Sequence, residues 1–387
     1  MNHSIENMKP SASLVLMKRA KEMQKTDPTV IGLAGGEPDF TTPGRISLAA
    51  IRSLTEGNTH YVVGPGIPEL RHAIAEKLRN ENCIDCDENC VLLTPGGKNA
   101  IYLAVCAILN PGEECMILDP SWVSYEPIVQ AARGVPVKVK LDYRNDYRIT
   151  REVLENACTE KTKLLILNYP NNPTGRILHR DEAEAVEQFL LAHPDLYLIS
   201  DEIYEKLVYD RKKSISMASY TSVKEQVITV NGFSKSAAMT GWRMGYLTAC
   251  REAFDVIYRL YQHSLSCMCG FLQVGAVEAF HCEREMEDMR RTYQQRRDLF
   301  CGALNQIPGV RCTPPEGAFY AWVYFDVQNM TSEQMCEFLL EKADVVGMPG
   351  SAYGEESVCC MRFSFANATE DLERAAANIT TAIKSLN

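Results

Sequence analysis

The sequence predicts an α/β fold with a large, mostly parallel sheet covered by helices and a second, smaller α+β domain. Three observations support this prediction. From about residue 90, short apolar runs alternate with helix-length segments; after about residue 253 the pattern becomes mainly helical; and strand-like runs return near the end of the sequence. Short, wholly apolar runs separated by helix-length segments are typical of parallel strands that are buried on both faces.

The predicted strands of the large sheet lie between residues 90 and 250. They read CVLLT (90–94), CMILD (115–119), VPVKVKL (135–141), KLLILN (163–168), LYLIS (196–200), QVITV (226–230) and GYLTAC (245–250).

The smaller domain is predicted from the last third of the chain. EREMEDMRRTYQQRRDLF (283–300) has the charge content of a long exposed helix, and AFYAWVYF (318–325) and CCMRFSFA (359–366) look like strands. We expect the N-terminal segment to complete this domain. The predicted boundaries are an arm and part of the small domain over 1–42, a large domain over 43–289 and a small domain over 290–387.

Composition narrows the possible functions. A formal net charge of -10 disfavours nucleic acid as a partner, because phosphate binding needs a basic face. No apolar run approaches the ~20 residues that span a bilayer, and MNHSIENMKP lacks the shape of a secretory signal. We therefore expect a cytoplasmic protein without a membrane partner.

The 15 cysteines are interpreted as reduced thiols that act as small hydrophobic residues. Cys83, Cys86 and Cys90 alone have ligand-like spacing, in NCIDCDENC. They offer three thiols with no obvious fourth ligand nearby, so a polar loop between a helix and a strand is favoured over a metal site.

Polar and aromatic residues follow the predicted strands directly. Ligands bind outside the carboxyl ends of the strands in an open α/β sheet, so these side chains are expected to share one site. They are Lys98, Trp122, Asn172, Asp201, Tyr204, Ser234 and Lys235.

Together these residues describe a site for pyridoxal phosphate. The turn in TPGGKNA opens a helix whose first amides suit a phosphate, although Leu92 and Asn99 break the P-loop pattern. Lys235 has only small neighbours in GFSKSAA, and a desolvated lysine amine is a nucleophile. Asp201 ends an apolar run, where a carboxylate needs a cationic partner, unless it merely caps a helix. This cofactor needs a lysine amine for the Schiff base and a turn that binds its phosphate. It also needs an aromatic side chain that stacks on its ring and a buried carboxylate beside its pyridinium nitrogen.

Six motifs occur in the order found in the class I aminotransferases: GGEPDF, YVVGPGIPELR, NNPTG, SDEIYE, SKSAAMTGWRMGY and MRFSFA. Across nearly the whole chain the sequence resembles that family, and most of all its bacterial aspartate aminotransferase subgroup, through MKPSAS and GGKNA. The resemblance implies the fold type I architecture, pyridoxal 5'-phosphate as cofactor and a homodimer with shared active sites.

The resemblance also implies roles toward the cofactor. Lys235 would hold it as a Schiff base and move the proton, Asp201 would keep the pyridine nitrogen protonated, and Trp122 would stack on the ring. The phenolic oxygen would be bonded by Asn172 and Tyr204. The phosphate would be held by Arg243 and the amides of Gly97 and Lys98, with Tyr61 reaching it from the neighbouring subunit, and Ser234 would be a further cofactor contact. On the evidence of the residues alone, Tyr61 and Trp122 could instead be core aromatics, and Arg243 could cap the end of a helix.

For the substrate, the resemblance places the α-carboxylate on Arg362, beside Gly36, Asn172 and Trp122. Lys98 would read a distal carboxylate, and the segment with Lys9 would close over the site. Structural pairing across the smaller sheet is the other interpretation of Arg362. Gly232 departs from many relatives, which have a serine there that helps to bind phosphate.

The sequence thus predicts an aminotransferase that moves an amino group between aspartate or glutamate and a 2-oxo acid, such as 2-oxoglutarate or oxaloacetate, by a ping-pong route. An aromatic, alanine or prephenate aminotransferase remains an alternative, because small local changes alter specificity on one fold. A lyase on the same fold and a non-catalytic cofactor sensor are the other hypotheses.

Overall fold

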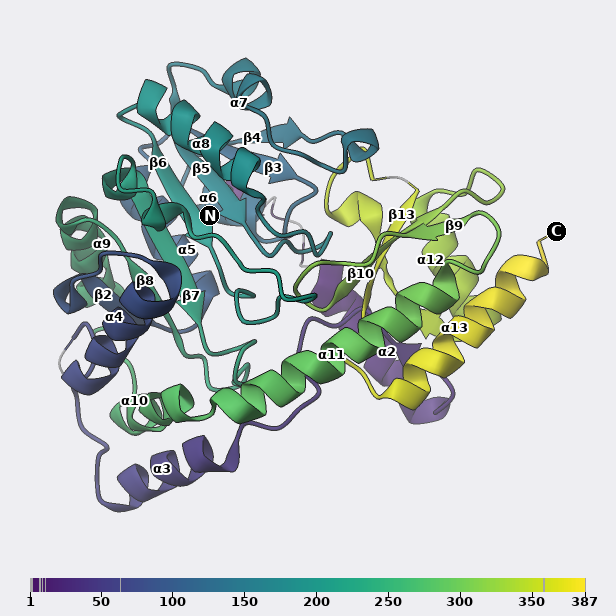
Figure 1. Cartoon of the computed structure of the whole chain (residues 1–387), viewed down its shortest axis with the longest axis horizontal. Coiled ribbons are helices and arrows are strands. Elements are labelled where there is room, and N and C mark those ends of the chain that lie inside the picture. Colours follow the sequence, from purple (N-terminus) through teal and green to yellow (C-terminus); the bar gives the residue numbers. More distant parts are fainter. Residues whose placement is uncertain are drawn as a thin grey trace.

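A computed structural model describes residues 3–6, 8, 10, 12–62, 64–357 and 359–386. Its large sheet lies on one side of the molecule and a smaller sheet on the other, with α11 (Glu283–Leu304) running alongside both (Figure 1). Lys9 lies outside the described residues.

The large sheet has seven strands in the order β2-β8-β7-β6-β5-β3-β4. Each predicted strand is confirmed, with bounds within two residues of the apolar runs. The strands are β2 (Val91–Thr94), β3 (Glu114–Asp119), β4 (Val135–Lys140), β5 (Thr162–Asn168), β6 (Tyr197–Asp201), β7 (Val227–Gly232) and β8 (Gly245–Thr248).

One strand departs from the parallel arrangement. β8 pairs antiparallel with both β7 and β2. A parallel neighbour needs a crossover connection, usually a helix, whereas residues 233–244 between β7 and β8 form only turns. These turns carry Lys235, so the reversal keeps the lysine segment at the edge of the sheet.

Alternate strand residues are buried on opposite faces of this sheet. Leu92 and Ile166 belong to an apolar cluster with α5 (Gly97–Ile108) and α9 (Arg251–Ser264), while their neighbours Leu93 and Leu165 pack in the other main cluster. This double burial explains why the strands are wholly apolar.

Further α-helices belong to this half of the molecule: α3 (Gly44–Thr55), α4 (Pro68–Asn82), α6 (Tyr125–Ala131), α7 (Arg151–Ala157), α8 (Arg180–Ala192) and α10 (Gly270–Val277). Its short 3-10 helices are η1 (Glu88–Cys90), η2 (Tyr143–Asn145), η3 (Met217–Ser219), η4 (Lys224–Gln226) and η5 (Glu278–His281).

The smaller sheet is antiparallel and has the order β12-β13-β10-β9. The predicted strands near 320 and 360 are both present. Its elements are β9 (Val310–Cys312), β10 (Tyr320–Phe325), α12 (Ser332–Ala343), β12 (Met348–Pro349), η6 (Gly350–Ala352), β13 (Cys360–Ser364) and α13 (Thr369–Lys384).

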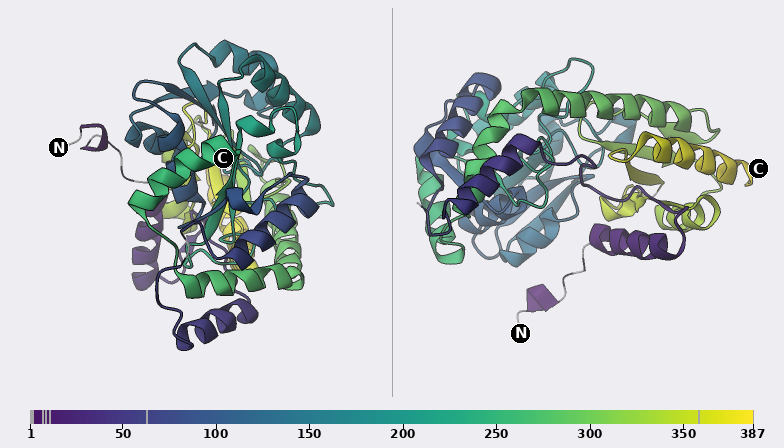
Figure 2. Two further views of the ribbon diagram at one scale, coloured as in Figure 1. Left: turned by 90° about the vertical axis from the view of Figure 1, so that its left-hand side faces the viewer. Right: turned by 90° about the horizontal axis from the view of Figure 1, so that it is seen from below.

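The N-terminal segment joins this smaller half. After α1 (His3–Glu6) and α2 (Ala12–Thr26), β1 (Ile31–Gly32) pairs parallel with β11 (Val345–Val346). Figure 2 shows α2 beside the C-terminal helices. The domain boundaries stay a prediction, and the one expected at residue 289 falls inside α11.

The expectation that the charged helix is exposed is wrong for one face of α11. Tyr293 and Phe300 are fully buried, and Arg297 is nearly so. The Arg297 guanidinium is compensated by Asp210, with Nη1 2.6 Å from Oδ2. Within the described ranges, no helix is both long enough and apolar enough to cross a membrane.

Candidate active site

A pocket of about 410 Å³ lies at the carboxyl ends of the central strands, facing the smaller sheet. Its lining brings together nearly all of the predicted site residues: Gly36, Gly97, Lys98, Trp122, Asn172, Asp201, Tyr204, Ser234, Lys235, Arg243 and Arg362. The sheet-edge rule therefore located this pocket correctly.

Lys235 reaches into the pocket from the turn after β7. Its Nζ donates a hydrogen bond to the carbonyl of Gly36, and lies 5.7 Å from the centre of the Phe319 ring. Burial lowers the pKa of this amine to about 8, although the charge of Glu37 opposes the shift. A larger fraction of Lys235 is therefore neutral and nucleophilic near neutral pH than of an ordinary lysine, although the protonated form still predominates.

Asp201 is the last residue of β6 and is buried. Its Oδ2 accepts a hydrogen bond of 2.6 Å from the Tyr125 hydroxyl, and Oδ1 accepts one of 3.3 Å from the Ile203 amide. Burial raises the pKa of Asp201 to about 6, against these two bonds and the charge of Lys235. Near neutral pH the pocket therefore holds a buried carboxylate that suits a protonated ring nitrogen.

The glycine turn before α5 forms a cradle with Arg243. Gly96 has a φ of +78°, and a Cβ there would lie 2.5 Å from Arg243 Nη2, so only glycine leaves room for the guanidinium. Arg243 donates to the Pro95 carbonyl at 3.1 Å and to the Thr240 carbonyl at 3.0 Å. The guanidinium thus stands beside the first amides of α5, an arrangement that suits a phosphate.

The departure at Gly232 has a steric cause. A Cβ on Gly232 would lie 2.8 Å from the Cα of Gly245, its partner across β7 and β8. A Cβ on Gly245 would in turn lie 2.6 Å from the backbone nitrogen of Gly97. Paired glycines let these strands and the phosphate turn approach closely, which leaves no space for a serine at 232.

Arg362 lies on β13 and is 3% exposed. Nη1 donates to Asn172 Oδ1 at 2.9 Å, and Nη2 donates to the Ala34 carbonyl at 2.7 Å. The guanidinium also stacks on Tyr320 of the neighbouring strand β10, 4.2 Å from the ring centre. Arg362 thus contacts a residue across the smaller sheet, while Asn172 and Ala34, which accept its hydrogen bonds, lie outside that sheet. Nε is buried and has no hydrogen-bond partner in the described part of the chain. A buried cation with a spare donor fits a carboxylate that binds in the pocket.

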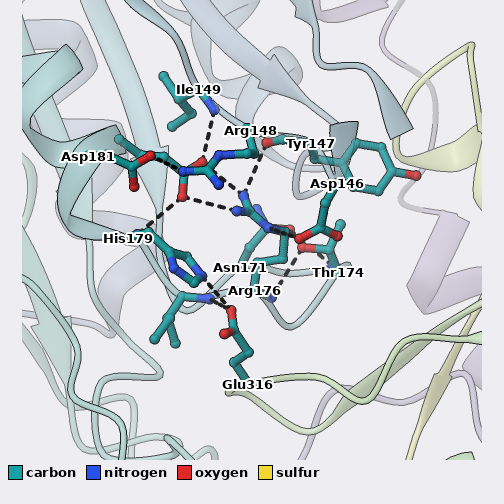
Figure 3. A network of polar contacts seen from close by, with 12 residues as sticks. Asp146, Tyr147, Arg148, Ile149, Asn171, Thr174, Arg176, His179, Asp181 and Glu316 are labelled. Carbon is teal, nitrogen blue, oxygen red and sulfur yellow. Dashed lines mark hydrogen bonds and ion pairs between the residues drawn. The ribbon is translucent and has the colours of Figure 1, made fainter. Parts of the chain in front are cut away.

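The loop that carries Asn172 is anchored by an arginine that the sequence reading missed. Arg176 Nη2 donates to Glu182 Oε2 at 3.0 Å, and Nη1 donates to the Tyr147 carbonyl at 3.1 Å. Nε donates to Asp146 Oδ2 at 3.1 Å (Figure 3). Glu182 is completely buried, so this ion pair fixes the loop against α8. No feature of NNPTGR separates Arg176 from a surface arginine.

A second polar contact joins this loop to the segment before β10. His179 Nε2 lies 2.9 Å from Glu316 Oε2, and Figure 3 shows the two side chains facing each other. Lys212 donates to the other oxygen of Glu316 at 2.6 Å. The loop from the large sheet is thus tied to the chain that leads into the smaller sheet.

Lys98 and Trp122 lie together in the pocket. The Lys98 ammonium stands over the Trp122 ring, 4.8 Å from its centre. Burial, and then the charge of Arg243, lower the pKa of Lys98.

Tyr61 is not brought to this pocket within one chain. Its side chain is 91% exposed. The predicted contact of Tyr61 requires a second subunit and stays a prediction.

Two tyrosines in the pocket were missed. The Tyr320 hydroxyl lies 2.8 Å from that of Tyr204, and Tyr125 bonds Asp201. Tyr125 comes three residues after Trp122, one helical turn away, which is the only available signal. In the sequence, both look like ordinary core aromatics.

All fifteen cysteines are free thiols. Cys83 is exposed, whereas Cys86 and Cys90 are buried between α4 and β2. Across the described ranges, no three His, Cys, Asp or Glu side chains are grouped so that they could hold a metal ion.

The family described as aminotransferase class I and II matches residues 28–379. The chain belongs to the class I and II aminotransferases. This confirms the resemblance drawn from the motifs. The aminotransferase is 39% identical to an aspartate aminotransferase of Musicola paradisiaca (strain Ech703), over 96% of this chain and 94% of the relative. It is 40% identical to aromatic-amino-acid aminotransferase 2 of Thermococcus litoralis, over 89% of this chain and 90% of the relative.

The fold of this aminotransferase is shared with solved structures. An aspartate aminotransferase from Thermus thermophilus with maleate has a TM-score of 0.94 and 35% identity, with 99% of each chain covered. The predicted fold type I architecture is confirmed.

Like its family, the aminotransferase depends on pyridoxal 5'-phosphate. The pocket fits this cofactor, because a glycine cradle, a buried carboxylate and a lysine of lowered pKa share it. When bound, the cofactor supplies an electron-accepting ring that stabilises negative charge at the α-carbon of an amino acid.

Proposed function

We propose that the enzyme transfers the amino group of aspartate or glutamate to a 2-oxo acid, such as 2-oxoglutarate or oxaloacetate. The observation that carries this proposal is the state of Arg362, a buried guanidinium with an unpaired Nε in a pocket that also contains Lys98. Two cations suit a substrate with two carboxylates. The aspartate aminotransferase names of several relatives, and the maleate in the Thermus thermophilus structure, support the same substrate class.

In this proposal the chain's own residues divide the work at the cofactor. Lys235 holds the cofactor through its amine and, once released by the substrate, moves a proton at the substrate α-carbon. Asp201 keeps the ring nitrogen protonated, and Trp122 stacks on the ring. The remaining contacts are Asn172 and Tyr204 at the phenolic oxygen, and Ser234, Arg243 and the amides of Gly97 and Lys98 at the phosphate.

At the substrate, Arg362 binds the α-carboxylate, beside Asn172, Trp122 and the amide of Gly36. Lys98 binds the distal carboxylate. Lys9, outside the described residues, is proposed to belong to the segment that closes over the site. The first oxo acid leaves before the second binds, so ping-pong kinetics are expected.

We further propose that the enzyme works as a homodimer in which Tyr61 contacts the phosphate in the neighbouring subunit. An apolar stripe on α3 supports this proposal: Leu48, Ile51 and Leu54 are 67%, 57% and 45% exposed. α3 packs on α10 at the outer edge of the molecule (Figures 1 and 2).

An aromatic donor is the second candidate. The Thermococcus litoralis relative named for aromatic amino acids is as similar as those named for aspartate. In this pocket Trp122, Tyr125 and Tyr320 offer ring surfaces.

A half-reaction titration separates the two candidates. The visible absorbance of the cofactor-loaded protein is followed while aspartate, glutamate, alanine, tyrosine and phenylalanine are added singly. Bleaching by the dicarboxylic donors, reversed by 2-oxoglutarate, is the expected result. Lys98→Ala should lower kcat/KM for aspartate about tenfold or more and leave alanine unaffected. A preference for aromatic donors would replace the substrate proposal. Product beyond one equivalent per site, formed without any added 2-oxo acid, would indicate a lyase.

A further inference from the structure

We propose that Tyr125 is a positioning residue that fixes the Asp201 carboxylate toward the cofactor site. The inference rests on the proposed role of Asp201 and adds a residue with which Asp201 performs it.

The contact between the two side chains has the geometry of a strong hydrogen bond. The Tyr125 hydroxyl donates to Asp201 Oδ2 at 2.6 Å, within the range of hydroxyl bonds to an ionised oxygen. Tyr125 is 2% and Asp201 is 5% exposed, so water does not compete. Both side chains also line the pocket.

The remaining oxygen of Asp201 is held less firmly. Within the described ranges, Oδ1 accepts only the 3.3 Å bond from the Ile203 amide, which lies in the turn that follows β6. Without Tyr125, the carboxylate would keep this one long contact and could rotate about its side-chain torsions. The tyrosine therefore supplies most of the orientation.

Tyr125 is itself placed by the turn that carries the aromatic plate. Its backbone amide donates to the Trp122 carbonyl at 3.1 Å, and the two rings meet edge to face at 5.3 Å. One turn at the start of α6 thus presents the plate and the hydroxyl together. Any shift of this turn would move both relative to β6.

The bond also affects the charge of Asp201. The titratable groups that face this carboxyl are Tyr125, Tyr204 and Lys235. A donor to the charged form lowers a carboxyl pKa, so removing the Tyr125 hydroxyl raises the pKa of Asp201 above its present value of about 6. More of the protein would then carry a neutral Asp201 near neutral pH, and its hold on a protonated ring nitrogen would weaken.

The test is a titration of the full-length protein, freed of cofactor, with pyridoxal phosphate between pH 5.5 and 8.5. For Tyr125→Phe we expect the dissociation constant at pH 7 to rise about tenfold, as for loss of a hydrogen bond to a charged group. The pH below which affinity declines should move up by about one unit. An unchanged constant and an unchanged pH profile would overturn the inference.

Tyr261→Phe is the matched control. Tyr261 is also fully buried and packs in the same apolar cluster as Tyr125, but it is not among the residues that line the pocket. The Tyr261→Phe variant should bind the cofactor as tightly as the unmodified protein does, with the same pH profile. Equal losses in both variants would mean that the tyrosines act through packing, and would also overturn the inference.

Asp201→Asn separates this inference from the proposed function. If Asp201→Asn binds the cofactor normally, the role of Asp201 fails and the inference fails with it. If Asp201→Asn weakens binding and Tyr125→Phe does not, only the inference fails. Adding Tyr125→Phe to Asp201→Asn should cause little further loss, because the two residues act through one contact.

Discussion

At the scale of single residues, burial without ion pairing sets the chemistry of the pocket. Lys235 and Arg362 are both cations whose hydrogen-bond partners are neutral oxygens in the described part of the chain. Among the described residues, neither cation forms an ion pair with a carboxylate, so each remains available to a ligand: the amine as a nucleophile, the guanidinium as a receptor for an anion.

The lowered pKa of Lys235 gives a prediction about pH. Only the neutral amine attacks an aldehyde, and a pKa of about 8 leaves the amine mostly protonated at pH 6. The rate of cofactor capture by the cofactor-free protein should therefore rise about tenfold per pH unit below 8 and level off above it. Stopped-flow absorbance after mixing with pyridoxal phosphate measures this rate. A rate that is flat from pH 6 to 9 would contradict the assignment.

Removing the amine gives a second prediction. Lys235→Ala should lower kcat by at least about a thousandfold, because both the covalent attachment and the proton transfer are lost. Steady-state assays with aspartate and 2-oxoglutarate measure the effect. Lys98→Ala, which changes the other lysine of the pocket, should keep the covalently bound cofactor and its absorbance. Normal turnover by Lys235→Ala would end the proposed mechanism.

At the scale of elements, two close approaches shape the site: the paired glycines of β7 and β8, and the anchored loop between β5 and α8. The first places the phosphate turn against the sheet, and the second holds Asn172 against Arg362. The contact of Gly245 with Gly97 and that of Asn172 with Arg362 each join segments far apart in the sequence.

Gly232→Ser tests the glycine contact. The serine would offer a hydroxyl near the phosphate turn, but its Cβ would meet the backbone of Gly245 at 2.8 Å. We expect the free energy of unfolding to fall by roughly 1–3 kcal/mol, as for other overpacked sites. Denaturant unfolding measures this, with Gly302→Ser as control, since a Cβ at Gly302 meets nothing within 4 Å. A stable Gly232→Ser variant that binds the cofactor more tightly would refute the steric explanation.

Arg176→Ala tests the anchored loop. It leaves Glu182 buried without its cation, which typically costs about 3–5 kcal/mol. Arg180→Ala is the matched control, because the Arg180–Glu184 pair lies on the same helix as Glu182 with side chains 84% and 50% exposed, and exposed ion pairs contribute little to stability. Urea unfolding of both variants should show a large loss for Arg176→Ala alone. Equal stability of the two variants would mean that the buried pair does not anchor the loop.

The elements show which parts of the fold the sequence could predict. The strands of the large sheet were predictable because burial on both faces makes each one continuously apolar, as in KLLILN. The reversed direction of β8 was not, since direction depends on the connection and not on composition. The buried face of α11 was missed because Arg296 and Arg297 look exposed in sequence, whereas distant partners, Asp39 and Asp210, compensate them.

The same distinction applies to the site. Motif residues at strand ends were predictable because a parallel sheet gathers its carboxyl ends at one edge. Tyr125 and Tyr320 were not, because their importance comes from contacts with residues distant in the sequence. Arg176 was not, because the sequence does not show that its partner Glu182, six positions further on, is completely buried. Nothing local distinguishes a core tyrosine from one that bonds Asp201.

At the scale of the whole molecule, the proposed dimer leads to a prediction. Ile51→Glu places a charge in the exposed apolar stripe of α3, and should shift the protein from dimer to monomer in sedimentation velocity. The cofactor affinity of the monomeric variant should also fall, because Tyr61 is proposed to complete the active site of the neighbouring subunit. Leu191→Glu is the control, since Leu191 is 48% exposed on α8. A dimer that persists in Ile51→Glu would mean that this stripe is not the interface.

The N-terminal segment has a consequence for how the chain acquires its activity. The carbonyls of Ala34 and Gly36 bond Arg362 and Lys235, and Leu33 bonds Ser364 on β13. During synthesis, Ala34 emerges 328 positions ahead of Arg362, its partner. The Ala34 carbonyl must therefore wait for its partner until the strand that carries Arg362 has left the ribosome. The large sheet can form in the meantime, but the pocket is complete only when the segment of residues 33–36 meets β13.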